Sequence, residues 1–284
     1  MDNSVAPSIA LPRVTGRSLP PCEFNIPIVH GKPTAHALRV AQGQALGQLV
    51  RGYLSPQECN RIVENFELNR GKRARADGVA GVTIGADLYG KKLDAYLAET
   101  RAARPDVEAL FRGTVDVTAM LRADIQATLG RGVTVRQASH QGEAYNTVRG
   151  VRWTGAGGYS LPFHDDAASL SFPGQRAGET ALVEVPNAYN IYPSVAASGG
   201  ELEIINVQPD DETRRRLGIE HTGFPYPVQA LATFDRLVIR PEPGDLLILA
   251  GAFCHGVRSV GPGLRLLLNH FGGFIAPDTF VTWS

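Results

Sequence analysis

The 284-residue sequence has no excess of charge of either sign and no long apolar run. Lys plus Arg and Asp plus Glu both number 28, so the formal net charge is zero. A nucleic-acid-binding or polybasic membrane-surface protein would show a strong basic excess. No run approaches the roughly 18 apolar residues of a membrane span. The start, Met1-Asp2-Asn3-Ser4, has no signal-peptide pattern. We therefore expect neither a nucleic-acid partner nor a membrane.

Cysteine is also scarce. Cys22, Cys59 and Cys254 are odd in number and widely spaced, which excludes a CxxC metal site and a disulfide framework. This cysteine usage predicts a reducing cytoplasmic location. Apolar residues make up 43% and charged residues 20%, which is typical of a globular chain. The 31 Gly and 19 Pro favour short strands and turns over a helical bundle.

The first half of the chain is predicted to be helical after a Pro-rich arm over residues 1–45. Ser55, Pro56 and Glu58 form a capping box with Pro at the first helical position, so a helix should begin there. Residues 69–90 are rich in Gly and Arg and predict a long mobile loop of functional importance. Apolar spacing over residues 105–129 predicts one long helix that stops at Gly130.

The second half changes to short β-branched runs separated by turns. Seven predicted strands cover residues 133–135, 147–149, 181–185, 201–205, 236–240, 245–249 and 265–268. Such a series predicts a sandwich or jelly roll. We expect one domain over residues 1–284: the arm, a helical buttress with an active-site loop at 46–130, and a jelly-roll core at 131–284. Residues 209–233 should form a lid or insert.

A His-x-Asp pattern at His164 and Asp166 is the first chemical motif. In a strand, residues two apart point to the same face, so this pair can offer nitrogen and oxygen to one metal. A second histidine from a distant strand would complete the 2-His-1-carboxylate set that holds non-haem Fe(II) with open positions. By itself the pair is weak, because a turn histidine beside a capping aspartate gives the same pattern.

The downstream segment strengthens the metal interpretation. Residues 241–245 form a Gly-Asp turn into an apolar strand, and His255 follows that strand. Arg265, ten residues later, opens another apolar strand, where its burial would be costly without an anion. A guanidinium suits a carboxylate bidentately. An edge-strand arginine in solvent is the alternative, but the joint pattern predicts His164, Asp166 and His255 as metal ligands.

At these residues the chain resembles the Fe(II)/2-oxoglutarate-dependent dioxygenases, over about residues 147–284. It is most similar to a small-molecule branch that contains N-succinyl-L-amino-acid (leucine) β-hydroxylases and carrier-independent indole-alkaloid halogenases. The sequence Gly199-Gly200-Glu201-Leu202 before a strand and the tail ending in Trp283-Ser284 carry this likeness. The resemblance implies an α+β fold with a double-stranded β-helix (jelly-roll, cupin-like) core buttressed by N-terminal helices.

The resemblance also implies the cofactors. Fe(II) would be held by His164, Asp166 and His255, with 2-oxoglutarate as cosubstrate, its distal carboxylate on Arg265, and O2 as oxidant. Halogenases of this kind lack the carboxylate ligand and leave a site for chloride. Because Asp166 is present, the resemblance implies hydroxylation, with 2-oxoglutarate converted to succinate.

The substrate is less well defined by the sequence. The resemblance implies an anionic small molecule, with the β-carbon of an N-succinyl or N-acyl aliphatic L-amino acid as the preferred site of hydroxylation. Arg149 could bind substrate or assist 2-oxoglutarate, and Asn269 could bind a carboxylate of either. Further substrate candidates are three cations near the expected mouth and two aromatic wall residues: Arg75, Lys92, Arg152, Phe163 and Tyr145. For each of them a solvated loop or core packing is the alternative.

Other functions stay open at this point. Within the oxygenases the alternative is tailoring of an alkaloid or another secondary metabolite. A cupin-type metal enzyme without an oxidative step, such as an isomerase, would not need Arg265. A protein that keeps the fold only for binding would be expected to lack one of the metal-ligating residues. A homodimer is compatible with the sequence, which fixes no oligomeric state.

Overall fold

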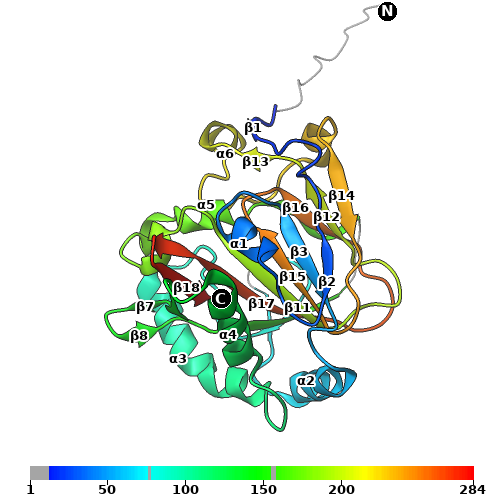
Figure 1. Ribbon diagram of the computed structural model, residues 1–284, viewed down its shortest axis with the longest axis vertical. Helices are drawn as coiled ribbons and strands as arrows, with labels where there is room; N and C mark the ends of the chain where they lie inside the picture. Colours follow the sequence, from blue (N-terminus) through cyan, green and yellow to red (C-terminus); the bar gives the residue numbers. More distant parts are fainter. Residues whose placement is uncertain (1–12, 76–77, 155–157) are drawn as a thin grey trace, which may run out of the picture.

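A large sheet dominates the computed structural model, which describes residues 13–75, 78–154 and 158–284 (Figure 1). Its strands are β2 (Ile28–His30), β3 (Gly47–Arg51), β4 (Arg73–Ala74), β5 (Gly81–Ile84), β6 (Thr134–Gln137), β9 (Arg149–Trp153), β11 (Asn187–Ser194), β15 (Asp245–Ala250), β17 (Arg265–Ala276) and β18 (Thr279–Trp283). The order is β2-β3-β15-β11-β17-β9-β5-β4, with β18 beside β17 and β6 beside β18. Only the β2–β3 and β6–β18 pairs of this sheet are parallel.

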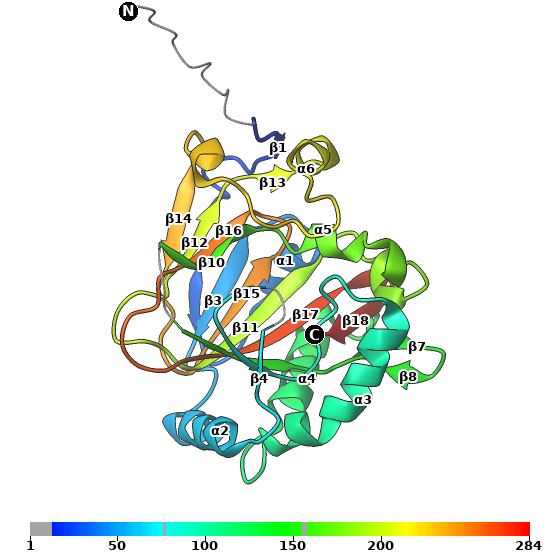
Figure 2. The same cartoon turned by 180° about the vertical axis from the view of Figure 1, so that it is seen from behind.

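A smaller antiparallel sheet faces the large one. It has the order β10-β16-β12-β14, and in Figure 2 its strands group on one side of the molecule while β17 crosses the other. Its strands are β10 (Tyr159–His164), β12 (Leu202–Ile205), β14 (Arg236–Ile239) and β16 (His255–Arg258). Two short pairs complete the strands of the described residues: β1 (Gly16–Arg17) with β13 (Gln208–Pro209), and β7 (Ser139–His140) with β8 (Glu143–Ala144).

The core lies between the sheets and under the helices. One buried cluster joins Leu246 and Leu268 of the large sheet to Ile204 and Val257 of the small one. Residues on the inner faces alternate with residues that point outward, as the period of two in a strand requires. This two-sheet arrangement agrees with the predicted jelly roll.

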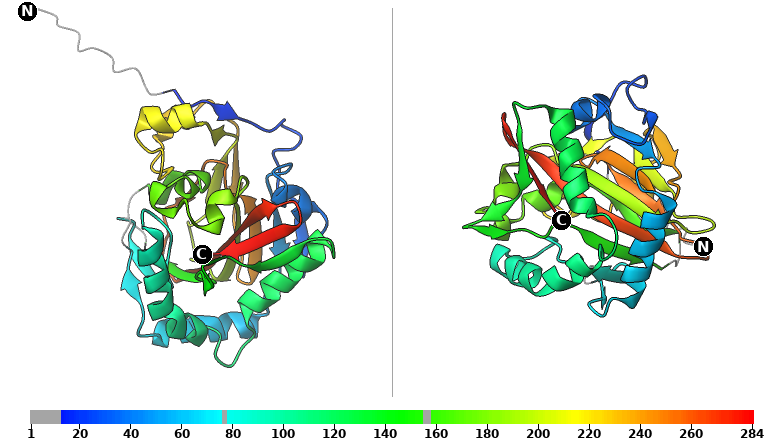
Figure 3. Two further views of the ribbon diagram at one scale, coloured as in Figure 1. Left: turned by 90° about the vertical axis from the view of Figure 1, so that its left-hand side faces the viewer. Right: turned by 60° about the horizontal axis from the view of Figure 1, so that its bottom comes forward.

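Helices α2, α3 and α4 surround one end of the sheets (Figure 3). The α-helices are α1 (His36–Ala41), α2 (Pro56–Leu68), α3 (Leu93–Ala109), α4 (Val117–Leu129), α5 (Ala167–Leu170) and α6 (Asp211–Leu217), and the 3-10 helices are η1 (Pro173–Gln175), η2 (Glu179–Leu182) and η3 (Val228–Leu231). The predicted start of α2 is confirmed, since Ser55 and Glu58 make both bonds of a capping box.

The prediction of one long helix over residues 105–129 is wrong. The chain forms α3 and α4 instead, and α4 begins anew where the Asp116 carboxylate accepts hydrogen bonds from the backbone N–H groups of Thr118 and Ala119. Gly113, at φ 70°, turns the chain between the two helices. Pro105 lies inside α3, where it removes one backbone hydrogen bond from a helix otherwise held by its buried face.

Two other segments differ from the prediction. Residues 69–90 are only partly loop, because β5 pairs with β9 as a strand of the large sheet. The strand predicted at 181–185 is wrong, and the chain there begins as η2. The strand follows immediately as β11, which pairs with both β15 and β17 although its sequence contains two Asn and a Pro.

The N-terminal arm belongs to the body more closely than expected. Residues 1–12 lie outside the described residues. After them, Leu19, Phe24 and Val40 are buried in the main core, and β2 extends the large sheet. Among the described residues, no helix has the length and apolar character needed to cross a membrane.

Candidate metal centre

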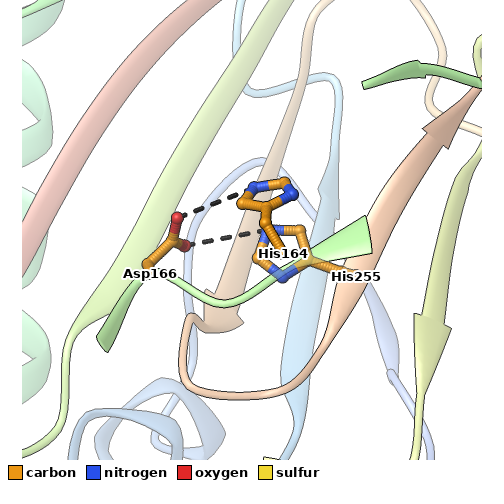
Figure 4. A group of neighbouring side chains, drawn as sticks. All are labelled: His164, Asp166 and His255. Atoms are coloured by element: carbon orange, nitrogen blue, oxygen red, sulfur yellow. Dashed lines mark ion pairs between the residues drawn. The ribbon is translucent and has the colours of Figure 1, made fainter. Parts of the chain in front are cut away.

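Three side chains from two strand ends meet between the sheets. His164 ends β10, Asp166 lies just after it, and His255 opens β16 directly opposite His164 in the strand register. His164 Nε2 lies 3.8 Å from Asp166 Oδ1, and His255 Nε2 lies 3.7 Å from Asp166 Oδ2 (Figure 4). Ligand atoms of all three residues lie within 4.8 Å of one another, so they can bind a single ion.

Backbone carbonyls fix the orientation of both imidazoles. The Nδ1 atom of His164 lies 3.1 Å from the Pro162 carbonyl oxygen, and that of His255 lies 2.7 Å from the Phe253 carbonyl oxygen. Each Nδ1–H group donates a hydrogen bond to its carbonyl, which leaves the Nε2 lone pair for a metal. Burial holds the pKa of His164 well below its usual range, so its ring stays neutral and able to ligate.

The Asp166 carboxylate is largely buried and incompletely paired. Its Oδ2 atom has no hydrogen-bond partner among the described residues, and burial raises the pKa of Asp166 to about 6. A cation would stabilise the ionised form and supply the missing partner. The three residues therefore fit a divalent metal through two nitrogens and one oxygen, the donor set typical of non-haem Fe(II) with open positions.

Gly251 lets the aspartate approach the strand end. The Asp166 N–H donates to the Gly251 carbonyl at 2.8 Å, and a Cβ on Gly251 would lie 2.6 Å from Asp166 Oδ2. Any larger residue at position 251 would push the carboxylate out of place. The segment that leads to His255 therefore needs a glycine at position 251.

The neighbouring Asp165 points away into a buried cluster. Its carboxylate accepts bonds from Arg214 Nε at 3.2 Å, Arg214 Nη2 at 3.0 Å and the Tyr226 hydroxyl at 2.7 Å. Arg214 is only 9% exposed, because α6 turns it toward Asp165. The cluster ties the predicted insert to the loop that carries Asp166.

A cavity of about 140 Å³ opens beside His164, Asp166 and His255. Both sheets contribute inward residues at period two. The large sheet supplies Arg149, Val151, Trp153, Ala188, Asn190, Tyr192, Arg265, Leu267, Asn269 and Phe271, and the small sheet supplies Leu161, His164, Leu202, His255 and Val257. The segment predicted as a lid or insert adds Thr222 and Phe224 to the lining.

Arg265 lies in this cavity, and no carboxylate of the residues that the structure describes pairs with it. It is 2% exposed, its Nε donates to the Gly200 carbonyl at 3.2 Å, and its guanidinium carbon lies 5.4 Å from the Tyr192 ring centroid. Within the described part of the chain its Nη1 atom has no hydrogen-bond partner, and burial lowers the pKa of Arg265. A buried cation with a donor left over needs an anion, so the site fits the distal carboxylate of 2-oxoglutarate.

Arg149 and Asn269 lie further along the same strands. They are opposite each other in the register, and Asn269 is four residues from Arg265, which is roughly 13 Å along a strand. Arg149 Nη2 donates to Asn269 Oδ1 at 3.3 Å, and Asn269 Nδ2 donates to Asn190 Oδ1 at 2.9 Å. All three residues line the cavity. They can bind the substrate, or the end of 2-oxoglutarate that lies away from Arg265.

Of the five predicted substrate residues, Arg75 lines the cavity, with its guanidinium carbon 4.7 Å from the Trp153 ring centroid. Lys92 is exposed just before α3 and lies outside the cavity lining. Arg152 points away from the cavity and pairs with Glu67 at 3.0 Å, because residues 151 and 153 take the inward positions of β9. These two predictions are corrected.

The two aromatic wall predictions are also corrected. Tyr145 is 1% exposed and packs edge-on against Tyr96 in a separate buried cluster. Phe163 is 1% exposed and packs against Tyr159. A register shift in β10 between Leu161 and His164 explains the second case, because both of these residues face the cavity and Phe163 turns away from it.

Some cavity residues were not found from the sequence. Asn190 and Tyr192 alternate with Ala188 along β11, and this period could have identified them if the strand had been predicted. Asp87 belongs to the loop between β5 and α3 and lines the cavity without belonging to any motif.

The sequence matches the family described as carrier-protein-independent halogenase WelO5 over residues 23–278. The chain belongs to this family. An L-isoleucine 3(1)-dioxygenase from Pantoea ananatis (strain AJ13355) is 29% identical over 246 residues, which cover 83% of this chain and 82% of the relative. The family membership confirms the resemblance drawn from the His-x-Asp, histidine and arginine pattern.

Solved structures confirm the fold. An N-substituted L-amino acid dioxygenase from Burkholderia ambifaria AMMD is similar with a TM-score of 0.57 at 14% identity, covering 88% of this chain and 91% of that one. The same protein in complex with alpha-KG gives a TM-score of 0.56 at 12% identity, with the same coverage. The jelly-roll core buttressed by helices is thus the fold of this chain.

Proposed function

We propose that this protein hydroxylates the aliphatic side chain of an L-amino acid or of its N-acyl derivative. The enzyme class is a non-haem Fe(II)/2-oxoglutarate-dependent dioxygenase. The observation that carries this conclusion is one cavity that holds both a complete His164, Asp166 and His255 set and a buried Arg265 with an unused donor. Each half alone would fit other metal or anion sites, and together they fit a metal with a chelating keto acid.

Each residue has a role that follows from its position. His164, Asp166 and His255 would hold Fe(II), which together with 2-oxoglutarate and O2 supplies the oxidation, with succinate and CO2 released. Arg265 would bind the distal carboxylate, and the Tyr192 and Trp153 rings beside it keep water away from that contact. Asp166 fills the ligand position that the halogenases leave for chloride, which supports oxygenation within this family.

The apolar lining supports an aliphatic substrate. Val151, Leu161, Leu202 and Val257 reach the cavity from both sheets, so a short hydrocarbon chain would exchange water for apolar contact there. The names of the relatives support an amino-acid substrate. We propose an anionic group at one end of that substrate, bound by Arg149 or Arg75, and we keep the β-carbon as the predicted site of hydroxylation.

The test is coupled turnover. Purified enzyme with Fe(II) and 2-oxoglutarate is offered L-isoleucine, L-leucine and N-succinyl-L-leucine in air, and succinate and product mass are measured. The proposal predicts succinate in step with a product heavier by one oxygen, and none from Asp166→Ala. If iron binds but no member of this panel increases succinate formation, amino-acid hydroxylation is wrong. An indole alkaloid that does so would favour the tailoring alternative, and no 2-oxoglutarate consumption at all would favour a non-oxidative metal enzyme.

Two further expectations belong with this proposal. Cys22, Cys59 and Cys254 are all free thiols, which supports a cytoplasmic location. A homodimer stays a prediction, and sedimentation at micromolar concentration would test it.

A further inference from the structure

We infer that Asp87 binds the α-ammonium group of the substrate, with Arg149 on the α-carboxylate, so that the preferred substrate is a free rather than an N-acylated amino acid. This inference rests on the proposed amino-acid hydroxylation and refines its substrate class. It makes Asp87 a specificity-determining residue, selecting at the substrate nitrogen rather than at the carbon that reacts.

Asp87 is the one side-chain carboxylate of the cavity lining, within the described residues, that neither the metal centre nor its support uses. The lining contains three aspartates. Asp166 is a metal ligand, and Asp165 is bound by Arg214 and Tyr226. Asp87 remains, with a side chain 20% exposed toward the cavity. An acid facing the substrate is unfavourable for an anionic group at that point and favourable for a cationic one.

The loop that carries Asp87 is held from two sides. Gln175, 1% exposed, donates through Nε2 to the carbonyls of Leu88 and Lys91. Asn146, 3% exposed, donates through Nδ2 to the carbonyl of Ala86 at 3.0 Å. Buried amides on both sides therefore fix the backbone around Asp87. The Asp87 carboxylate therefore has a defined position in the cavity wall, unlike an acid on a loop that is surrounded by solvent.

Asp87 lies in a row of alternating charges. Its Oδ2 atom is 3.7 Å from Arg149 Nη1 and 3.3 Å from Lys91 Nζ. Lys91 Nζ lies closer to Glu99 Oε2, at 2.6 Å, and does not line the cavity. Both distances from Asp87 exceed those of a strong charged hydrogen bond, so the acid keeps capacity for a closer donor.

Asp87 and Arg149 together present opposite charges side by side to the cavity. An α-amino acid carries its ammonium and carboxylate on one carbon, so a single ligand can meet both groups at once. An N-acyl group replaces the ammonium with a neutral amide, and an N-succinyl group adds a second carboxylate near Asp87. The free amino acid gains a charge-assisted bond where the N-succinyl form meets like charge.

The experiment compares substrates that differ only at nitrogen. Binding of L-isoleucine, N-acetyl-L-isoleucine, N-succinyl-L-isoleucine and 3-methylpentanoate, which lacks the amine, is titrated calorimetrically to protein loaded with Ni(II) and 2-oxoglutarate. Coupled succinate formation is measured for the same compounds with Fe(II). Wild type should prefer L-isoleucine by roughly 10- to 100-fold in Kd over the other three, the range expected for one charged hydrogen bond.

Two variants separate the two ends of the substrate. Asp87→Asn should raise the Kd and KM of L-isoleucine by roughly 10- to 100-fold while leaving those of N-acetyl-L-isoleucine within about threefold. Arg149→Gln should weaken both compounds, because both have the carboxylate. Asp94→Asn, which removes an exposed acid from the first turn of α3, is the matched control and should change neither.

The outcomes distinguish this inference from the proposed function. If N-acyl compounds drive coupled succinate formation better than L-isoleucine, or if Asp87→Asn weakens all four compounds equally, the ammonium assignment is wrong and amino-acid hydroxylation stands. If none of the amino-acid compounds binds or increases succinate formation in wild type, the proposed function itself fails. A selective loss for L-isoleucine in Asp87→Asn, with unchanged melting temperature, supports the inference.

Discussion

At the metal end of the pocket, formed by His164, Asp166 and His255, each ligand is held by backbone groups at a strand end. At the charged wall, Arg149 and Asp87 line the cavity, and Lys91 and Glu99 continue the ionic row outside the lining. These side chains are held mainly by one another. The metal end has the single geometry that metal binding requires. The charged wall is an ionic row that joins a loop to β9 and α3, where the sign of each charge matters more than its exact position.

The metal end thus serves the reaction, and the charged wall serves the choice of substrate. A metal requires its donors within narrow limits, so strand ends and backbone carbonyls suit it. Substrate choice requires only that one ligand gain more free energy than another, which a single charge on a loop can provide. Changes at the metal end should therefore affect every substrate alike, and changes at the charged wall should affect substrates unequally.

The largest expected effect comes from removing a ligand at the metal end. His255→Ala should abolish Fe(II)-dependent succinate formation with every substrate. The loss should exceed the roughly 10- to 100-fold reduction typical of losing an outer partner of a ligand. Iron content and turnover are measured together, with the more exposed His221→Ala as control. A His255→Ala enzyme that keeps both iron and turnover would break the assignment of the metal end.

The next largest effect is expected at Arg265, which we propose binds 2-oxoglutarate rather than the metal or the substrate. Arg265→Met should raise the KM for 2-oxoglutarate by roughly 100- to 10,000-fold, because two charged hydrogen bonds are lost, while Fe(II) affinity stays nearly the same. Steady-state kinetics and iron titration measure these quantities, and the exposed Arg240→Met is the control. An unchanged KM for 2-oxoglutarate would contradict the role given to Arg265.

The Asp165 cluster supports the loop of Asp166 at the metal end, so its loss should lower the free energy of unfolding. Arg214→Met leaves the buried Asp165 carboxylate with a much weaker set of partners, so the free energy of unfolding should fall by about 3–5 kcal/mol. The neighbouring exposed Arg215→Met should change it by less than about 0.5 kcal/mol. Urea titrations measure both. Equal values for the two variants would mean that the Asp165 cluster does not support the loop of Asp166.

The smallest effect is a pH-dependent one away from both regions. Glu179 accepts two bonds from Arg136, at 2.8 and 2.7 Å, and this pairing holds the pKa of Glu179 below its usual 4.5. A lowered folded-state pKa stabilises the protein above the unfolded value, and the contribution is lost as pH falls through the folded one. Because the pair is partly exposed, we expect at most about 1 kcal/mol.

Urea titrations of wild type and Glu179→Gln at several pH values measure this contribution. Wild type should be more stable at pH 7, and the difference should shrink as the pH falls below about 4.5, the usual pKa of Glu. A difference that grows with acid would show that the sign is wrong.

The metal end could be predicted from sequence because its residues lie at or just beyond strand ends. His164 ends β10 and Asp166 follows two residues later, outside the strand, while His255 and Arg265 each border an apolar run. The helix start at Ser55 was equally readable, since a capping box is local. The break between α3 and α4 was missed because apolar spacing continues across a cap at Asp116.

The charged wall could not be predicted in the same way. Asp87 has no motif, and it reaches the cavity only because Gln175 and Asn146 hold its loop. Phe163 was misplaced because a register shift in β10 reverses its side, which no composition rule reveals. Strand β11 was missed because its asparagines disfavour a strand, although pairing on both edges outweighs that preference.

The central claim is that His164, Asp166 and His255 hold iron together with 2-oxoglutarate, and anaerobic absorption spectroscopy tests it most directly. Wild-type protein is mixed with Fe(II) and then 2-oxoglutarate without air, and the weak visible metal-to-ligand charge-transfer band is recorded beside Asp166→Ala. We predict the band in wild type, its loss in Asp166→Ala, and a shift when L-isoleucine is added. Iron bound to wild type without any band after 2-oxoglutarate would contradict the account.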